Sequence, residues 1–266
     1  MLASVFGKTL YDMRRGLIWW SISLLLMNLW MVSLYPVIQE SAEALEQYLS
    51  NLPPTFSALV GEAATFSTIE GYLSVELFTF FLPMLTLAFA IVYGAGAIGG
   101  EEDSGTLDLL LAHPIPRWRV LAEKFVAVLA FTAVAVLAGF VGIILGAMLV
   151  DVKIEPWKVG AATLNLGLLT VLFGTFTLAL TGVGLRRGSA AGIGAGLAAI
   201  TFLMNTLAPI ADLPEQLRKV SPWFYYDGGA TLREGLRLGN SALLAGLVVV
   251  LLLVALYGFQ RRDIAV

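Results

Sequence analysis

Residues 99–124 read GGEEDSGTLDLLLAHPIPRWRVLAEK and form a charged break between two long apolar runs. Either Ser104 or Asp103 is expected to cap a short helix here, because side-chain oxygens accept hydrogen bonds from the first free backbone N–H groups of a helix. Pro114 follows and stops the helix, which we predict over residues 106–112.

The predicted helix has one apolar face. Leu107, Leu110 and Leu111 fall at positions i, i+3 and i+4, whereas Asp108 points away from them. An apolar face that lies just outside a membrane predicts a binding partner.

The composition indicates an integral membrane protein. Of 266 residues, 58% are hydrophobic and only 13% are charged, and the mean hydropathy is +0.85. Soluble domains are nearer a quarter charged. The chain has no cysteine and a single histidine, His113, so we predict neither disulfides nor a metal site.

Six apolar runs are each long enough, at ~1.5 Å per residue, to cross ~30 Å of hydrocarbon. They cover residues 17–38, 77–98, 125–150, 159–185, 189–210 and 241–259. The predicted fold is therefore an all-α membrane protein in which residues 1–266 form one transmembrane domain.

Shorter elements flank these spans. Residues 1–15 predict an amphipathic helix that lies on the inner membrane face. The acidic stretch 40–74 predicts a helix over 41–49 followed by an external loop. Before the sixth span, residues 212–215 resemble a helix start, residues 232–238 suggest a second short helix, and the aromatic run 223–226 matches an interfacial belt.

Small and hydroxyl residues predict helix-packing faces within the spans. In the fourth span they recur at steps of three and four, at Thr163, Gly167, Thr170, Gly174, Thr177 and Thr181. In the fifth span the small residues are Gly188, Gly192 and Gly196. Both patterns allow close helix approach, and the fourth-span seam has lining of a translocation path as its alternative interpretation.

The second span ends in Gly94-x-Gly96-x-x-Gly99, a formal match to the dinucleotide-binding fingerprint. That fingerprint requires a strand before it and a helix after it. Because an apolar helix precedes these glycines, we interpret them as a close packing surface and a helix stop.

An even number of spans places both termini on one side of the membrane. That side has the larger number of basic residues, namely Lys8, Arg14, Arg15, Arg117, Arg119, Lys124, Arg186, Arg187, Arg261 and Arg262. The other side has Lys153, Lys158, Arg218, Lys219, Arg233 and Arg237. Both termini and residues 99–124 are therefore expected in the cytoplasm of a prokaryotic cell, with the chain in its plasma membrane.

No ionisable residue lies deep inside the six runs, and the chain has no complete phosphate-binding loop. Ion-coupled carriers and intramembrane proteases usually need buried acidic or basic groups. Energy for any active process is therefore expected to come from a partner.

Residues 101–111, together with Pro114, Arg117 and Lys124, resemble the cytoplasmic signature of type-2 ABC transporter permeases. The resemblance lies in an acidic pair, a Gly-Thr-Leu-acid-x-Leu-Leu core and a Pro-x-x-Arg ending. It implies six spans, a cytoplasmic coupling helix after the second span and short external helices before the sixth. The residues that match the signature are Glu101, Glu102, Gly105, Thr106, Leu107, Asp108, Leu110, Leu111, Pro114 and Arg117.

The resemblance also implies partners. A permease of this kind dimerises with a second copy or a related permease and docks two separate ATPase subunits. ATP and magnesium are then bound by the ATPase and no cofactor by this chain, and nucleic acid is not an expected partner.

The sequence thus favours the membrane subunit of an ABC exporter, which is not itself an enzyme. A non-transporting membrane scaffold or assembly factor and a passive channel are the two alternatives. A neighbouring gene for an ATPase would favour the first.

Overall fold

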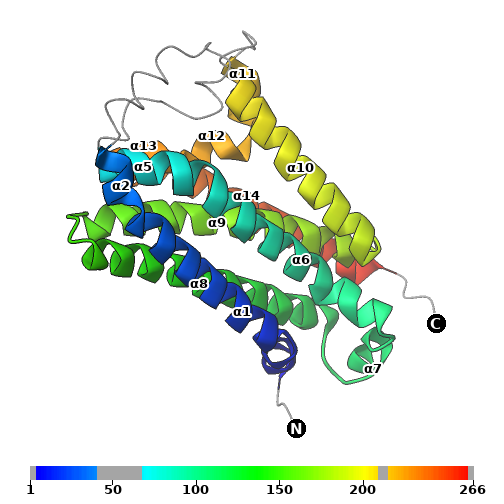
Figure 1. Cartoon of the computed structure of the whole chain (residues 1–266). Coiled ribbons are helices and arrows are strands. Elements are labelled where there is room, and N and C mark those ends of the chain that lie inside the picture. The colour runs from blue at the N-terminus through cyan, green and yellow to red at the C-terminus, as the bar shows by residue number, and fades with distance from the viewer. Residues whose placement is uncertain (1–3, 41–67, 209–214, 263–266) are drawn as a thin grey trace.

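The protein, described here by a computed structural model over residues 4–40, 68–208 and 215–262, consists of helices and the turns that join them, with no strand in those residues (Figure 1). Six helical segments in the described residues are long and apolar enough to cross a membrane. They are α1 (Val5–Ser33) with α2 (Tyr35–Glu40); α5 (Ile69–Tyr72), η2 (Leu73–Phe81) and α6 (Leu82–Asp103) as one run; α8 (Arg117–Leu149); α9 (Pro156–Gly182); α10 (Arg187–Leu207); and α14 (Leu238–Arg261). The six predicted spans are confirmed.

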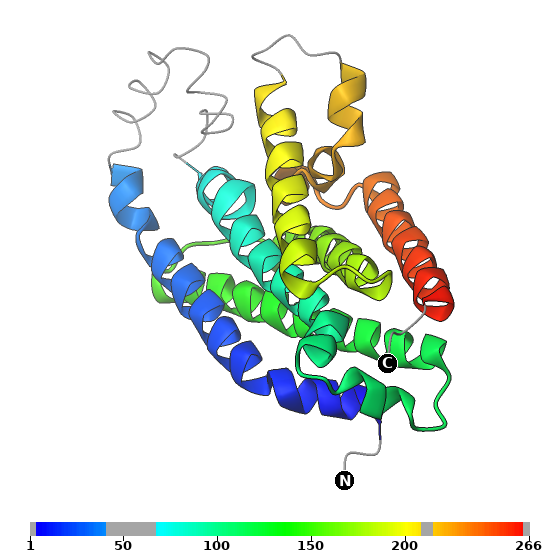
Figure 2. The same cartoon turned by 90° about the vertical axis from the view of Figure 1, so that its right-hand side faces the viewer.

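The centre of the molecule is α9, which packs against α6, α8, α10 and α14 (Figure 2). Its residues Leu166, Leu169 and Phe173 are buried in the main apolar core. The outer helix α1 runs along α8, where a Cβ added at Gly142 would lie 2.4 Å from the Leu25 carbonyl oxygen. Glycine is therefore required for these two helices to approach as closely as they do.

The second span differs from its predicted bounds at both ends. It begins at Ile69, so the external loop predicted through residue 74 is wrong for its last residues, and Glu70 and Glu76 belong to the helical run. It continues to Asp103, so the glycines at 94–99 do not stop the helix. A glycine most often ends a helix by adopting a left-handed backbone, whereas Gly94, Gly96 and Gly99 are helical and lie in contact with other helices.

The N-terminal helix predicted over residues 1–15 is continuous with the first span in α1. Ser4 caps it by accepting from the Gly7 N–H at 3.0 Å. Val5 and Thr9 are buried against the rest of the chain. This segment therefore packs on the protein.

Three short helices precede α14: α11 (Glu215–Val220), α12 (Pro222–Tyr226) and α13 (Gly228–Glu234). Two were predicted, and the second of these lies at 228–234 instead of 232–238. The predicted interfacial belt is wrong for Trp223 and Tyr226, which are buried because α12 folds inward. The Tyr226 hydroxyl donates to the Phe78 carbonyl at 2.7 Å, and burial raises the pKa of this phenol well above its usual value. The helix predicted over 41–49 and the helix start at 212–214 lie outside the described residues.

The first turn of α1 and the last turn of α14 lie at the same end of the molecule, beside α7 (Leu107–Leu111) (Figures 1 and 2). The Phe6 N–H donates to Glu123 near the start of α8, and Arg117 donates to the Arg262 carbonyl at 2.7 Å. The expectation that an even number of spans brings both ends of the chain to one side is thus met by the described residues.

Candidate functional site

The link between α6 and α7 is a tight helix-terminating turn. The Thr106 N–H donates to the Glu101 carbonyl at 2.8 Å, and the Gly105 N–H donates to the Glu102 carbonyl at 3.0 Å. These two bonds form a Schellman motif, whose left-handed position is Gly105 with φ of +66°. The glycine of the Gly-Thr pair is therefore needed to turn the chain away from α6.

The predicted caps of α7 are wrong. Ser104 donates its hydroxyl back to the Gly100 carbonyl at 2.8 Å, and the residue that precedes α7 is Thr106, whose side chain makes no capping bond. The turn between α6 and α7 takes up Asp103 and Ser104, so neither can reach the first N–H groups of α7.

The apolar face of α7 lies against its own chain. Leu107 is only 3% exposed and is buried with Ile98 and Leu121, while Leu110 and Leu111 pack partly on the same cluster. The sequence predicted that Leu107 is exposed and available to a partner. That prediction is wrong, because the ends of α6 and α8 already cover Leu107.

The outward face of α7 carries Asp108 and Leu109. Leu109 is 68% exposed and was not among the predicted contacts. Leu109 lies off the i, i+3, i+4 stripe that its own chain covers. A leucine outside that stripe is the signal in the sequence that could have identified it as exposed. Pro114 is also exposed, in the extended stretch that joins α7 to α8.

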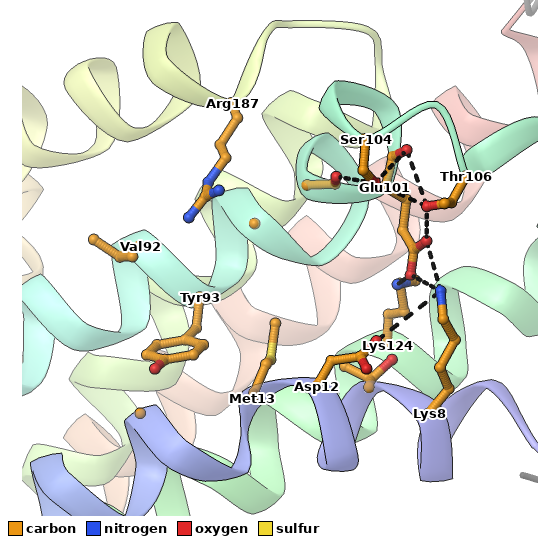
Figure 3. Close-up of a pocket in the computed structure, with 14 residues that line it drawn as sticks. Lys8, Asp12, Met13, Val92, Tyr93, Glu101, Ser104, Thr106, Lys124 and Arg187 are labelled. Atoms are coloured by element: carbon orange, nitrogen blue, oxygen red, sulfur yellow. Dashed lines mark hydrogen bonds and ion pairs between the residues drawn. The ribbon is translucent and has the colours of Figure 1, made fainter.

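A buried carboxylate holds this segment to the helices around it. The Lys8 ammonium lies 2.8 Å from both oxygens of Glu101, and the Lys124 ammonium lies 2.9 Å from one of them (Figure 3). The Thr106 hydroxyl donates to the other oxygen. The carboxylate therefore connects α1, α6, α8 and the start of α7.

Glu101 is 8% exposed and Lys124 is 2% exposed. The Glu101 carboxylate is thus occupied inside the chain, and its contact with an ATPase subunit stays a prediction. A buried ion pair persists only when its remaining hydrogen-bonding capacity is also satisfied, and here three donors supply that.

A second set of contacts joins the segment to the end of α14. Glu102 pairs with Arg262, which also donates to the Thr181 carbonyl of α9 at 3.1 Å. Arg117, predicted as a site residue, donates to the Arg262 carbonyl. The segment is thus fixed at both of its ends, and α7 is held in one position relative to α9 and α14.

Comparison with known proteins decides the family. A model described as "ABC-2 family transporter protein" matches residues 3–264. The chain belongs to the ABC-2 transporter family. The resemblance inferred from residues 101–111 is therefore confirmed.

Two curated relatives carry the name "Probable ABC transporter permease protein NosY". The one from Stutzerimonas stutzeri is 33% identical over 151 residues, which are 55% of this chain and 53% of that protein. The one from Pseudomonas aeruginosa is 32% identical over 167 residues, 61% of this chain and 58% of that protein. An uncharacterized Bacillus subtilis protein, YhcI, is 36% identical over 59 residues, 22% of this chain and 19% of that protein. The chain spans about half the length of the two permeases that it matches.

The fourth-span seam of this ABC-2 chain lies mainly against α6, while a Cβ added at Gly167 would lie 3.6 Å from Val136 of α8. Thr170 donates to the Thr86 hydroxyl at 3.0 Å, and a Cβ added at Gly94 would lie 2.2 Å from the Gly174 carbonyl oxygen. Thr163, Thr177 and Thr181 are also buried, and Gly167 is half-buried. Within one copy of the chain the seam is a packing face.

The fifth-span glycines behave differently. A Cβ added at Gly188, Gly192 or Gly196 would meet no atom within 4 Å. The glycine of α10 that does pack is Gly194, where a Cβ would lie 2.3 Å from Thr177. The predicted close-packing ladder is therefore not used inside this chain.

Asn165 of α9 is a structural centre that the sequence analysis missed. Its amide donates to the Tyr226 carbonyl, and its side-chain oxygen accepts from Ser241 at 3.0 Å. It joins α9, α12 and α14 at the end opposite α7. The available signal was a lone asparagine in an apolar span, where an unpaired amide would be costly.

No group of three His, Cys, Asp or Glu side chains in the described part of the chain is arranged to hold a metal ion. The only histidine, His113, is exposed and contacts the Leu109 carbonyl through its Nδ1 at 2.9 Å.

Proposed function

We propose that the chain is the membrane-spanning permease subunit of an ABC exporter and couples to separate ATPase subunits through residues 99–124. The observation that carries the proposal is α7 itself. It is a short helix held rigidly at one end of the bundle, with an exposed leucine at its outer surface. An exposed leucine side chain contributes binding free energy when a partner's pocket removes it from water.

In this proposal two ATPase subunits bind ATP and magnesium, and each docks on the α7 of one permease. Closure of the ATPases pushes α7, and the Glu101 contacts pass that displacement to α1 and α8. The α7 end then faces the cytoplasm of a prokaryotic cell, in agreement with the excess of basic residues at that end.

The second permease copy, identical or related, is proposed to pack on α10. This helix is exposed along Gly188, Gly192 and Gly196, and small residues at this spacing let helices approach closely in lipid. The translocation path would then lie between the two copies.

The test is Leu109→Asp, which places a carboxylate on the surface of α7 without touching the core. The expected result is a chain made at normal levels that retains the ATPase at least about thirtyfold more weakly, since truncating a central anchor typically costs about 2 kcal/mol. Leu238→Asp is the matched control, because Leu238 is 76% exposed and starts α14 at the other end of the bundle.

Co-purification of the ATPase and substrate-stimulated ATP hydrolysis are the two measurements. If Leu109→Asp leaves both unchanged, α7 is not the coupling helix and the proposal fails. Docking that depends on Leu109 without any stimulated hydrolysis or transport would favour the scaffold. Transport without an ATPase would favour the channel.

A further inference from the structure

A cavity of about 530 Å³ lies at the α7 end, between α1, α6, α8 and the first turn of α10 (Figure 3). At one end it is lined by Lys8, Glu101 and Lys124. At the other end it is lined by Val92, Tyr93 and Arg187, with Met13 between the two ends (Figure 3). The cavity therefore has a polar half around Glu101 and a more apolar half, in which Val92 lies beside Tyr93 and Arg187.

The charges of the polar half largely balance. Lys8 and Lys124 both bind Glu101, and the Lys8 ammonium also lies 4.0 Å from Asp12. Arg187, which lines the same cavity, is exposed and has neither an ion pair nor a hydrogen bond with any described residue. The net positive charge of the cavity is thus that of the Arg187 guanidinium.

Two glycines of α6 leave space for the Arg187 side chain. A Cβ added at Gly96 would lie 3.6 Å from the Arg187 Nε, and one added at Gly99 would lie 2.9 Å from the Arg187 Cβ. Figure 3 shows the side chain reaching from α10 toward the cavity beside α6. The Gly96-x-x-Gly99 spacing that formally matched a nucleotide motif thus makes room for an arginine.

Tyr93 also lines the cavity, but its hydroxyl lies against α1, where a Cβ added at Gly16 would lie 1.6 Å from the hydroxyl oxygen. Figure 3 shows this hydroxyl directed away from the Arg187 guanidinium. The cationic donor that is available to an anionic group is thus Arg187.

The chemistry of such a ligand follows from the two halves of the cavity. A phosphate diester offers charged oxygens to a guanidinium, which forms strong charge-assisted hydrogen bonds with phosphate. The apolar half continues onto the outer surface of α6, where Val92 is 48% exposed, and α1 carries Trp19 at 70% exposed. Basic pockets between spans at a membrane surface bind anionic headgroups, and exposed tryptophan is typical of the interface.

We infer that this cavity binds the headgroup of an anionic phospholipid from the leaflet at the α7 end, with its phosphate on Arg187 and its acyl chains along Val92. Arg187, which would hold the phosphate, is not among the residues proposed to contact the ATPase. A bound lipid would neutralise Arg187 and fix the start of α10 against α1 and α6.

The test uses the full-length chain in detergent, titrated with dioctanoyl phosphatidylglycerol and followed by native mass spectrometry. We expect saturable binding that is at least tenfold tighter than that of dioctanoyl phosphatidylcholine. Arg187→Gln should weaken phosphatidylglycerol binding about fivefold, in line with the contribution of one basic residue near an anionic headgroup. Gly96→Val should also weaken it, since the added methyl groups displace Arg187 while the charge is kept.

Arg186→Gln is the matched control, because it removes the same charge from the adjacent residue, which does not line the cavity. Its affinity should stay within twofold of the unmutated chain. Equal losses in Arg186→Gln and Arg187→Gln, or equal binding of the two lipids, would overturn the assignment. Displacement of the lipid by an equal concentration of inorganic phosphate would assign the cavity to a soluble phosphate instead. If Gly96→Val does not fold, the comparison of Arg187→Gln with Arg186→Gln still tests whether Arg187 binds the lipid.

Discussion

Glu101 is the residue on which the position of α7 most depends. Its removal would leave the Lys124 ammonium, 2% exposed, without its carboxylate. Breaking a buried pair in this way costs about 3–5 kcal/mol. We therefore predict that Glu101→Ala lowers the melting temperature in detergent strongly.

The neighbouring residue supplies a control for that prediction. The Glu102 side chain is 39% exposed, so Glu102→Ala should shift the melting temperature little. The double variant Glu101→Leu/Lys124→Met should recover part of the loss, because it removes both charges from the buried site. Equal melting temperatures for Glu101→Ala and Glu102→Ala would contradict the network.

The sequence alone did not identify the role of Glu101. It lies beside Glu102 and Asp103 in a charged stretch, which favoured an exposed surface charge. Its partner Lys8 is 93 residues away and reaches it only because α1 packs along α8. Local sequence patterns carry no information about such a long-range contact.

At the scale of elements, the two glycine faces predict opposite results. Gly94 faces the Gly174 carbonyl across α6 and α9, so Gly94→Val should destabilise the chain by roughly 1–3 kcal/mol or more through overpacking. Gly192 faces open space within one copy. Gly192→Leu should therefore leave the melting temperature of the single chain unchanged.

If a second copy packs on α10, as proposed, Gly192→Leu will instead weaken the dimer. Light scattering or native mass spectrometry of the detergent-purified chain measures this. A variant that stays dimeric and stable would place the second copy elsewhere, and a melting temperature that falls as far as that of Gly94→Val would contradict the open face.

The elements themselves were predictable from the sequence. Apolar length located all six spans, and the charged break together with Pro114 located α7, although the cap predicted for its start was wrong. The sequence patterns do not show which surface of the folded chain covers each helix face. The stripe that contains Leu107 is covered by its own chain, whereas the glycines of α10 are not. In the sequence both sets are simply apolar or small residues at helical spacing.

At the scale of the whole molecule, the bundle has two distinct ends. One holds α7, the Glu101 network and most of the basic residues, and the other holds α11, α12 and α13 (Figure 1). The even number of spans and the uneven distribution of basic residues predict this division. Both can be counted in the sequence without knowledge of any contact between helices. The same asymmetry predicts which end faces the cytoplasm.

That orientation can be tested with reporter fusions. Fusions after Val266 and within residues 110–117 should both report the cytoplasm. Fusions near Pro53 and in the connection between α8 and α9, at residues 151–155, should both report the outside, because each is separated from the first pair by an odd number of spans. The last site matters most, since its placement depends on α8 and α9 both crossing the membrane. A cytoplasmic signal at residues 151–155 would contradict the crossing of α8, and agreement between the Pro53 and Val266 reporters would overturn the six-span arrangement.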